Sequence, residues 1–407
     1  MFDVNKIRND FPMIKNNPDL VYLDNSATSF KPQCVIDEVV NFYTNCTSNI
    51  HRGDYGISVK VSNAYEDTRK VVANFINADK PKEIVFTSGA SASLNLIANG
   101  FALKYINNGV ILTTYAEHAS NILPWFKVAK ENNVKIEYIP LNDDGTFNLE
   151  KYKECFEKYD VKLVSLPYIS NVLGYKYPIK EVTAIAHENN ALINVDGAQA
   201  VPHIKVDVKD LDIDFLSFSA HKMCGPSGVG VLYGKYELLE KMDPVYMGGG
   251  SNARFDKEGN IILKKAPTKF EVGTPNIEGV LGLRKAVEYL ELIGMNNIEA
   301  YDKELLDYFK SKLSKLDNVI IYNPNSDCSI ISFSVKGIFA QDASAYLNQM
   351  GIAVRSGNHC AKILHNIIGT DDSIRASLYF YSTKDEIDKL VDVLKDITLE
   401  KCIGAVI

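Results

Sequence analysis

The sequence contains no run of about 18 apolar residues, the length that crosses a bilayer, so no membrane span is expected. It also contains no dense cluster of Lys or Arg. Its 44 basic residues stand against 51 acidic ones, a net charge of −7, whereas binding to nucleic-acid phosphates requires concentrated positive charge. The first residues carry acids where a secretion signal requires a basic flank and an apolar stretch. These absences predict a cytoplasmic protein that binds small molecules or other proteins.

The seven cysteines include no Cys-x-x-Cys pair and are scattered along the chain. An odd and scattered set favours neither a disulfide framework nor a structural zinc site. Residues 225–230 do not form Gly-x-Gly-x-x-Gly, so a dinucleotide-binding fold has no support either.

What the chain does contain is an alternation of short apolar runs and helical stretches between residues 82 and 233. Near-continuous apolar strands separated by helices are typical of a mostly parallel sheet covered on both faces. The runs cover residues 83–87, 109–113, 161–166, 191–196 and 215–219. Ligands bind beyond the carboxyl ends of such strands, so the polar residues that follow them are the candidates for a site.

A second unit follows, because a long amphipathic pattern at residues 298–316 leads into further short strands and helices. A chain of 407 residues exceeds what one core usually supports. We therefore expect a large domain over residues 20–290, a small α+β domain over residues 291–407, and an N-terminal segment, residues 1–19, that packs with the small domain. A turn-like stretch at residues 256–260 predicts a hairpin that leaves the large domain.

Lys222 and Asp196 indicate a cofactor. Lys222 follows a predicted buried strand, and a lysine near a low-dielectric strand end can lose its proton and become a Schiff-base nucleophile. Taken alone, a lysine at this place is more often an ordinary solvated loop residue. Asp196 ends another apolar strand, where a buried carboxylate requires a cationic partner. A pyridinium nitrogen is such a partner, so the two residues together suit pyridoxal phosphate (PLP).

Other polar residues could complete such a site, although each also has an ordinary structural interpretation. The turn at residues 87–91 leads into a helix whose first backbone amides could bind a phosphate or simply be capped. His118 could stack on a pyridine ring or serve a structural role. Arg355 and Arg375 could make planar, bidentate contacts with a carboxylate, or could be surface charges.

Cys360 lies in a glycine-containing loop with basic neighbours, and such surroundings favour the nucleophilic thiolate. We expect most of the other six cysteines to be small buried hydrophobes. His359, Cys360 and His365 could instead be zinc ligands, but their spacing matches no familiar zinc site.

Four motifs, in this order, resemble the class V PLP enzymes of the cysteine desulfurase family, and most closely its group II, SUF-type branch. The motifs are Asp196-Gly197-Ala198-Gln199, Ser219-Ala220-His221-Lys222, Phe270-Glu271-Val272-Gly273-Thr274-Pro275-Asn276 and Arg355-Ser356-Gly357-Asn358-His359-Cys360-Ala361. The resemblance covers nearly the whole chain. It implies PLP-dependent transferase fold type I, an aspartate aminotransferase-like α/β fold with a mostly parallel sheet in the large domain and a smaller α+β domain.

The resemblance also implies a role for each matching residue. Lys222 would hold the cofactor as a Schiff base, Asp196 would pair with its ring nitrogen, and His118 would stack on its ring. The contacts implied for the ring hydroxyl and the phosphate are Gln199, Ala90, Ser91, Ser219, His221 and, reaching across to the other subunit of a dimer, Thr274. The contacts implied for the substrate are Asn171 and Arg375 at its carboxylate, and Arg355, His51 and Arg52 at the entrance.

The implied activity is L-cysteine desulfuration, in which L-cysteine becomes L-alanine and Cys360 keeps the sulfur as a persulfide. The persulfide would pass to an acceptor protein of the SUF system, for iron-sulfur cluster or other sulfur-compound biosynthesis. A homodimer is implied because the hairpin within residues 250–273 resembles a family element that crosses the dimer interface. The alternatives are a selenocysteine lyase or C-S lyase of the same fold, and a non-catalytic scaffold for sulfur assembly.

Two places depart from the family pattern. Ala90 stands where close relatives have a hydroxyl residue, which removes one side-chain donor to the phosphate. Asn358 replaces a histidine that is common in the family, and residues 362–365 differ from the usual run after Cys-Ala.

Overall fold

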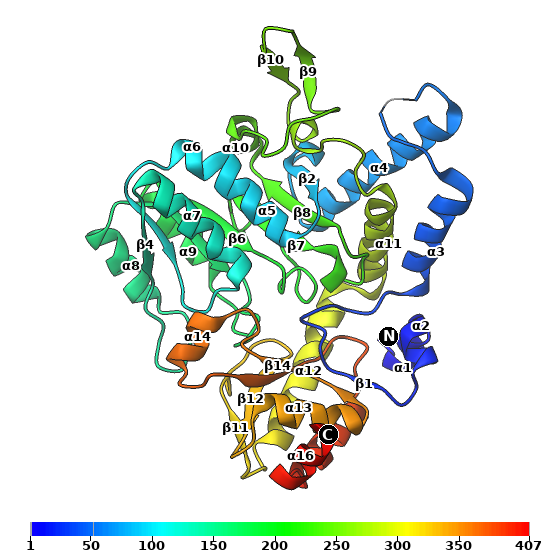
Figure 1. Ribbon diagram of the computed structural model, residues 1–407, viewed down its shortest axis with the longest axis vertical. Coiled ribbons are helices and arrows are strands. Elements are labelled where there is room, and N and C mark those ends of the chain that lie inside the picture. Colours follow the sequence, from blue (N-terminus) through cyan, green and yellow to red (C-terminus); the bar gives the residue numbers. More distant parts are fainter. Residues whose placement is uncertain (1, 52, 407) are drawn as a thin grey trace.

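A seven-stranded sheet forms the centre of the computed structural model, which describes residues 2–51 and 53–406 (Figure 1). Its strand order is β2-β8-β7-β6-β5-β3-β4. Of these seven, β8 is antiparallel to both of its neighbours, and the other pairs are parallel. The strands are β2 (Ile84–Thr87), β3 (Val110–Thr113), β4 (Lys135–Tyr138), β5 (Val161–Pro167), β6 (Leu192–Asp196), β7 (Phe215–Ser219) and β8 (Gly230–Gly234). The mostly parallel sheet expected from the sequence is confirmed.

Helices cover both faces of this sheet, because successive side chains of a strand point to opposite faces. In β3, Val110 and Leu112 belong to one buried cluster, while Ile111 between them belongs to another. The first cluster includes side chains of α4 (Gly56–Phe75) and α11 (Ile277–Ile293), and the second includes side chains of α7 (Leu123–Asn132). The near-continuous apolar strands in the sequence reflect this two-sided burial.

Two strands of the seven-stranded sheet were not foreseen. The edge strand β4 alternates charged and apolar residues and is largely half-buried, so it lacks the continuous apolar run of its neighbours. Strand β8 begins at Gly230, where a Cβ would lie 2.3 Å from the Cα of Gly89. Glycine is required there by this close approach of two backbones, and its presence weakens the strand pattern in the sequence.

A second, smaller sheet lies below the first in Figure 1, with the order β11-β12-β15-β14 and antiparallel pairing throughout. Its strands are β11 (Val319–Ile321), β12 (Ile330–Val335), β14 (Arg355–Gly357) and β15 (Ser373–Ser377). Its apolar core is shared with α12 (Met295–Leu313), α13 (Ala340–Gln349) and α15 (Lys384–Lys395). A short α14 (Lys362–Ile367) follows β14, and α16 (Leu399–Val406) ends the chain against α13.

The N-terminal segment that carries α1 (Val4–Arg8) and α2 (Pro12–Asn16) contacts both units. Arg8 donates a 2.7 Å hydrogen bond to the Tyr381 carbonyl, and the Phe11 ring packs 4.6 Å from the Tyr381 ring. Tyr289 of α11 donates to Asp10 at 2.8 Å. The domain limits 1–19, 20–290 and 291–407 stay a prediction.

The expected hairpin is formed by β9 (Asn252–Phe255) and β10 (Ile261–Leu263), and it projects from the top of the molecule in Figure 1. Its turn is closed by a hydrogen bond from the Asp256 amide to the Asn260 carbonyl. Among the described residues, no helix combines the length and apolarity that a membrane crossing requires.

Candidate active site

Most of the predicted site residues line one cavity of about 240 Å³ at the carboxyl ends of β5, β6 and β7. The small unit contributes the opposite wall of the cavity. The predicted residues that line it are Ala90, Ser91, His118, Asn171, Asp196, Gln199, Ser219, His221, Lys222, Arg355, Cys360 and Arg375. Parallel strands therefore bring together residues far apart in sequence at the edge of the sheet where ligands bind.

Lys222 reaches this cavity from a single turn, Ala220–Lys222, that directly follows β7. Burial lowers the pKa of its amine to about 8, and the positive charges of Arg375 and Arg355 act in the same direction, while Asp196 opposes them. A substantial fraction of this amine is therefore neutral near pH 7 to 8, and a neutral amine is a nucleophile and a base.

Asp196 is the last residue of β6 and is almost fully buried. One oxygen, Oδ1, accepts a 2.9 Å hydrogen bond from the Ala198 amide. Burial raises the pKa of this carboxyl group, and the Ala198 amide and Lys222 partly offset that effect. A buried carboxylate with so few partners favours a cationic ligand group in the cavity.

His118 caps a short turn before α7, and its ring has a defined tautomer. The Ser120 amide donates to His118 Nδ1 at 3.1 Å. Burial lowers the pKa of His118 to about 4, with Lys222 and Arg375 contributing, so the ring is neutral near pH 7. Because Nδ1 accepts a hydrogen bond, the proton lies on Nε2, and His118 is a hydrogen-bond donor at that atom.

One end of the cavity lies at the N-terminus of α5 (Ala90–Ile97). The Ala90 amide donates to Ser219 Oγ at 2.8 Å, and Ser91 Oγ lies 2.6 Å from Ser120 Oγ. Since both serines line the cavity, this hydroxyl pair stands close to the position that Ala90 leaves without a hydroxyl group. Amides at a helix N-terminus favour anions.

Cys360 is the exposed cysteine among the seven, whereas Cys155, Cys224, Cys328 and Cys402 are buried and Cys34 and Cys46 are half-buried. Burial raises the pKa of the Cys224 thiol to about 12, which keeps that sulfur protonated and unreactive. Two hydrogen bonds from the large unit hold the loop that carries Cys360. Asn171 Nδ2 donates to the His359 carbonyl at 2.9 Å, and the Ala119 amide donates to the Cys360 carbonyl at 2.7 Å.

Arg375 lies in the middle of β15 and is buried beside the cavity. It donates to Asp24 Oδ1 and to the Asn171 carbonyl, both at 3.1 Å. Its Nε has no hydrogen-bond partner among the described residues. A buried guanidinium with an unused donor is suited to binding a carboxylate.

Three predicted residues lie elsewhere or outside the described part of the chain. His51 is 3.4 Å from Glu66 and lines a different cavity. Thr274 accepts a 3.2 Å hydrogen bond from Asn49 Nδ2 and does not line the Lys222 cavity of its own chain. Arg52 lies outside the described residues. The predicted roles of all three stay predictions.

Several residues of the cavity wall were missed, among them Ser26, Ser120 and His359. Ser26 arrives from the N-terminal part of the chain, where its carbonyl accepts a 2.9 Å hydrogen bond from Gln199 Nε2. A serine in a polar segment carries no signal in the sequence that would mark it. No group of three or more His, Cys, Asp or Glu side chains within residues 2–51 and 53–406 is arranged to hold a metal ion.

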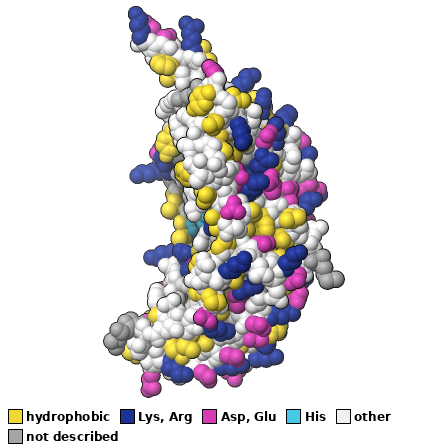
Figure 2. All heavy atoms as spheres, turned by 90° about the vertical axis from the view of Figure 1, so that its right-hand side faces the viewer, with side chains coloured by type: hydrophobic (Ala, Val, Ile, Leu, Met, Phe, Trp, Pro, Cys, Tyr) yellow, Lys and Arg dark blue, Asp and Glu magenta, His cyan; other side chains and the backbone are white. Residues whose placement is uncertain are grey.

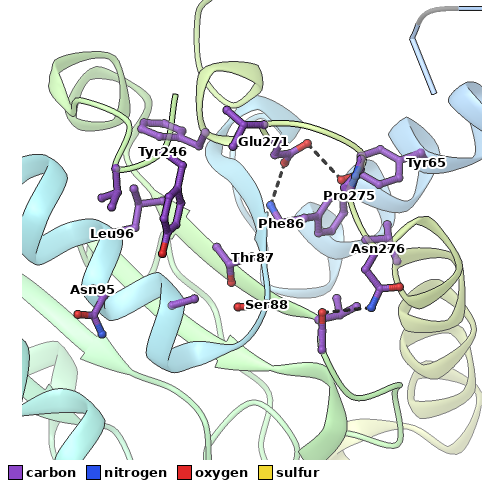
Figure 3. A pocket seen from close by; sticks show the side chains of 17 residues that line it. Tyr65, Phe86, Thr87, Ser88, Asn95, Leu96, Tyr246, Glu271, Pro275 and Asn276 are labelled. Carbon is purple, nitrogen blue, oxygen red and sulfur yellow. Dashed lines mark hydrogen bonds between the residues drawn. The ribbon is translucent and has the colours of Figure 1, made fainter. Parts of the chain in front are cut away.

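A second, more apolar cavity of about 310 Å³ lies between α4, α5 and the segment that precedes α11 (Figure 3). Glu271 is the charged residue of its wall, and its carboxylate accepts hydrogen bonds from the Phe86 amide at 2.9 Å and from Tyr65 at 3.2 Å. In Figure 3, Tyr246 lies near Leu96, on the side of the cavity away from Tyr65. Two apolar residues of this wall, Val245 and Tyr246, are exposed to solvent.

Comparisons with known proteins agree with this geometry. The family model for class V aminotransferases matches residues 21–390. The chain is 40% identical to a cysteine desulfurase of Haloferax volcanii over 96% of each chain. It is 41% identical to a probable cysteine desulfurase of Synechocystis over 96% of this chain and 94% of the relative.

Solved structures give a consistent picture. The apo cysteine desulfurase of Thermococcus onnurineus superimposes with a TM-score of 0.91 at 35% identity, over 96% of this chain and 97% of that one. A cystine C-S lyase in complex with cysteine persulfide shares the fold, with a TM-score of 0.82 at 21% identity over 95% and 99% of the two chains. The fold therefore accommodates more than one reaction at a C-S bond.

Proposed function

The chain belongs to the class V aminotransferase family, and from that membership and the geometry of the cavity we propose that it is a PLP-dependent cysteine desulfurase. It converts L-cysteine to L-alanine and leaves the sulfur as a persulfide on Cys360. The observation that carries this function is that one cavity is lined both by an amine of lowered pKa, Lys222, and by the exposed thiol of Cys360.

The residues of the cavity fit PLP. Lys222 supplies an amine that is neutral near its pKa of about 8. Asp196 supplies a buried carboxylate for a pyridinium nitrogen. Gln199 Oε1 is buried with no hydrogen-bond partner among the described residues, so it is free to accept from a ring hydroxyl. The first turn of α5, with Ser91 and Ser120, supplies donors for a phosphate.

When bound, PLP withdraws electrons from the α-carbon of the substrate, which makes the α-proton removable. Lys222 Nζ then accepts that proton, since its amine is neutral for part of the time near pH 7 to 8. The Arg375 guanidinium holds the substrate carboxylate through its unused donor. Asn171 Nδ2 already holds the His359 carbonyl, so it keeps the Cys360 loop close to the bound substrate.

Cys360 Sγ completes the reaction by attacking the substrate sulfur. A sulfur–sulfur bond forms as the carbon–sulfur bond breaks. The carbon keeps the electron pair of the broken bond and is protonated, so cysteine and the enzyme thiol become alanine and the enzyme persulfide. His118 Nε2–H lies in the same cavity and can donate a hydrogen bond during this step.

We also propose a homodimer of the SUF-type branch that acts in the cytoplasm. Tyr246, Met247 and Phe255 are 74%, 61% and 70% exposed. Figure 2 shows the β9–β10 hairpin projecting beyond the body of the molecule with basic side chains at its tip and hydrophobic ones below them. A second copy would cover this apolar surface and would bring its Thr274 and His51 to the neighbouring cavity. The acceptor of the persulfide is a protein of the SUF system.

The test is a Cys360→Ala variant assayed for alanine formation from L-cysteine. Alanine formation should be lost while the PLP absorbance band stays, because Cys360 is the sulfur acceptor and does not bind the cofactor. Cys46→Ala is the control, since Cys46 is half-buried and lies outside the cavity. In the wild type, mass spectrometry of the peptide containing Cys360 should show a gain of one sulfur atom after turnover.

The alternatives give different outcomes in this experiment. A selenocysteine lyase or C-S lyase would continue turnover without the thiol, so an active Cys360→Ala variant would support a lyase. A protein that stays colourless with added PLP would support a non-catalytic scaffold.

A further inference from the structure

A closed ring of hydrogen bonds surrounds the backbone of Cys360. The side chain of His359, on one side of Cys360, contacts Ser373 Oγ through Nε2 at 3.0 Å. Ser373 Oγ in turn lies 2.9 Å from His365 Nε2. His365 Nδ1 lies 3.1 Å from the carbonyl of Ala361, on the other side of Cys360. The ring meets the main chain at His359 and at Ala361, so Cys360 is the one residue between its two ends.

The direction of each hydrogen bond in the ring follows from chemistry. A carbonyl only accepts, so the His365 proton lies on Nδ1, and Nε2 of the neutral ring accepts from the Ser373 hydroxyl. That hydroxyl has one proton, so Ser373 Oγ must accept from His359 Nε2–H. Burial lowers the pKa of His365 and, to about 2, that of His359, which keeps both rings neutral as this arrangement requires.

The ring holds a backbone that would otherwise relax. His359 and Cys360 have φ values of 50° and 58°, the left-handed region that is unfavourable for residues with a Cβ. The side chains of His359, His365 and Ser373 are almost fully buried, so water cannot replace their partners. Strained non-glycine residues persist where the surrounding structure imposes their conformation, and they gather at functional sites.

The same loop is tied to its surroundings at further points. The carbonyls of His359 and Cys360 accept from Asn171 and from the Ala119 amide. The Asn358 side chain donates to the Asp371 carbonyl, so this departure from the family pattern also fastens the loop. The ring and these bonds leave the side chain of Cys360 as the exposed part of a fixed segment.

We propose that Ser373 and His365 are positioning residues for sulfur transfer, because they close the ring that fixes the backbone on both sides of Cys360. This inference rests on the proposed function of Cys360 as the sulfur acceptor. Neither residue lines the cavity, so both act through the loop. Cys360 Sγ then meets the substrate sulfur by side-chain rotation from a fixed backbone, which keeps the two sulfur atoms in line for attack.

The test compares Ser373→Ala with Ser329→Ala in the PLP-loaded enzyme. Ser329 is a matched control, since it is buried and its hydroxyl donates a 2.8 Å hydrogen bond to the Asp302 carbonyl, away from the loop. Ser373→Ala should slow persulfide formation in a single turnover by about tenfold to a hundredfold, with KM for cysteine and the PLP spectrum unchanged. Hydrogen exchange of residues 358–362 should become faster in Ser373→Ala only.

A second pair of variants opens the ring at its other member. His365→Leu should reproduce the slow persulfide formation, and His365→Gln should restore part of the rate, because its side-chain oxygen can still accept from Ser373. If Ser373→Ala does not fold, the comparison of His365→Leu with His365→Gln tests the role of the ring in its place.

The inference is overturned if the ring variants match Ser329→Ala both in the rate of persulfide formation and in hydrogen exchange. A wild-type enzyme that forms no persulfide on Cys360 would instead refute the proposed function. The hydrogen-exchange comparison would still decide whether the ring holds the loop.

Discussion

Burial has opposite consequences for an amine and for a thiol. It lowers the pKa of Lys222 to about 8, because removing water disfavours the charged amine, and so it produces a usable base. Burial of a thiol disfavours the thiolate instead, as the raised pKa of Cys224 shows. The amine is therefore useful inside the cavity, while the thiol must be exposed, as Cys360 is.

The shifted pKa of Lys222 predicts how the apo-protein takes up PLP as the pH changes. The neutral amine reacts, and its fraction rises about tenfold per pH unit below the pKa and is constant above it. The rate of uptake, followed by absorbance, should therefore rise up to about pH 8 and then level off. A rise that continues to about pH 10, as for an ordinary lysine, would contradict the lowered pKa.

An Asp196→Asn variant provides a second test of the pKa of Lys222. The Asp196 carboxylate raises the pKa of Lys222, so its removal should move the plateau to lower pH. An unchanged profile would mean that the two groups do not interact.

At the scale of elements, one buried ion pair joins α4 to the segment that leads into α11. Arg69 Nη1 and Nη2 donate to the two oxygens of Glu271 at 2.7 and 2.8 Å, and Nη1 also donates to the Ile84 carbonyl at 2.8 Å. Glu271 accepts the Phe86 amide of β2. This pair therefore fixes β2 just before the turn that begins α5 and its anion-binding end.

Removing one member of this pair leaves a buried charge without its partner. Arg69→Met should lower the free energy of unfolding by about 3–5 kcal/mol, measured by urea titration. The neighbouring pair Lys70–Asp67 is the control, because its side chains are 62% and 48% exposed. Lys70→Met should cost about 0–1 kcal/mol, and equal effects of the two substitutions would refute the argument.

At the scale of the whole molecule, the large unit supplies Lys222, Asp196 and His118, and the small unit supplies Cys360 and Arg375. The proposed reaction requires both sets around one cavity. The β9–β10 hairpin projects from the top of the molecule in Figure 1, at the opposite end from the small unit. In the proposed dimer, the second copy would add its Thr274 and His51 to this same cavity.

A charge placed on the proposed dimer surface should separate the subunits. Tyr246→Glu should halve the mass measured by light scattering and lower desulfurase activity, because burying an unpaired carboxylate at an interface is costly. Phe339 has the same 74% exposure as Tyr246 but lies in the small unit, so Phe339→Glu should leave the mass unchanged. A monomeric wild type would refute the dimer.

The central strands could be predicted because burial on both faces requires continuous apolar runs, as in β5 and β7. Strands β4 and β8 could not, since one is half-buried and the other is bounded by glycines. Lys222 and Asp196 were recognisable because charged residues at the ends of apolar strands are costly without a function. Ser120 and Ser26 were not, because a small hydroxyl residue occurs as readily in an ordinary loop as in a site, whether it is half-buried like Ser120 or buried like Ser26.

The sequence by itself determined which reactive groups the protein has, how the strands alternate with helices, and the family to which the chain belongs. These properties are local, since they depend on residue identity and on patterns along the chain. The pKa of Lys222, the exposure of Cys360 alone among the cysteines, and the ring through His359, Ser373 and His365 were decided by the tertiary structure. Burial and hydrogen-bond distance depend on contacts between distant segments, and only the folded chain brings those segments together.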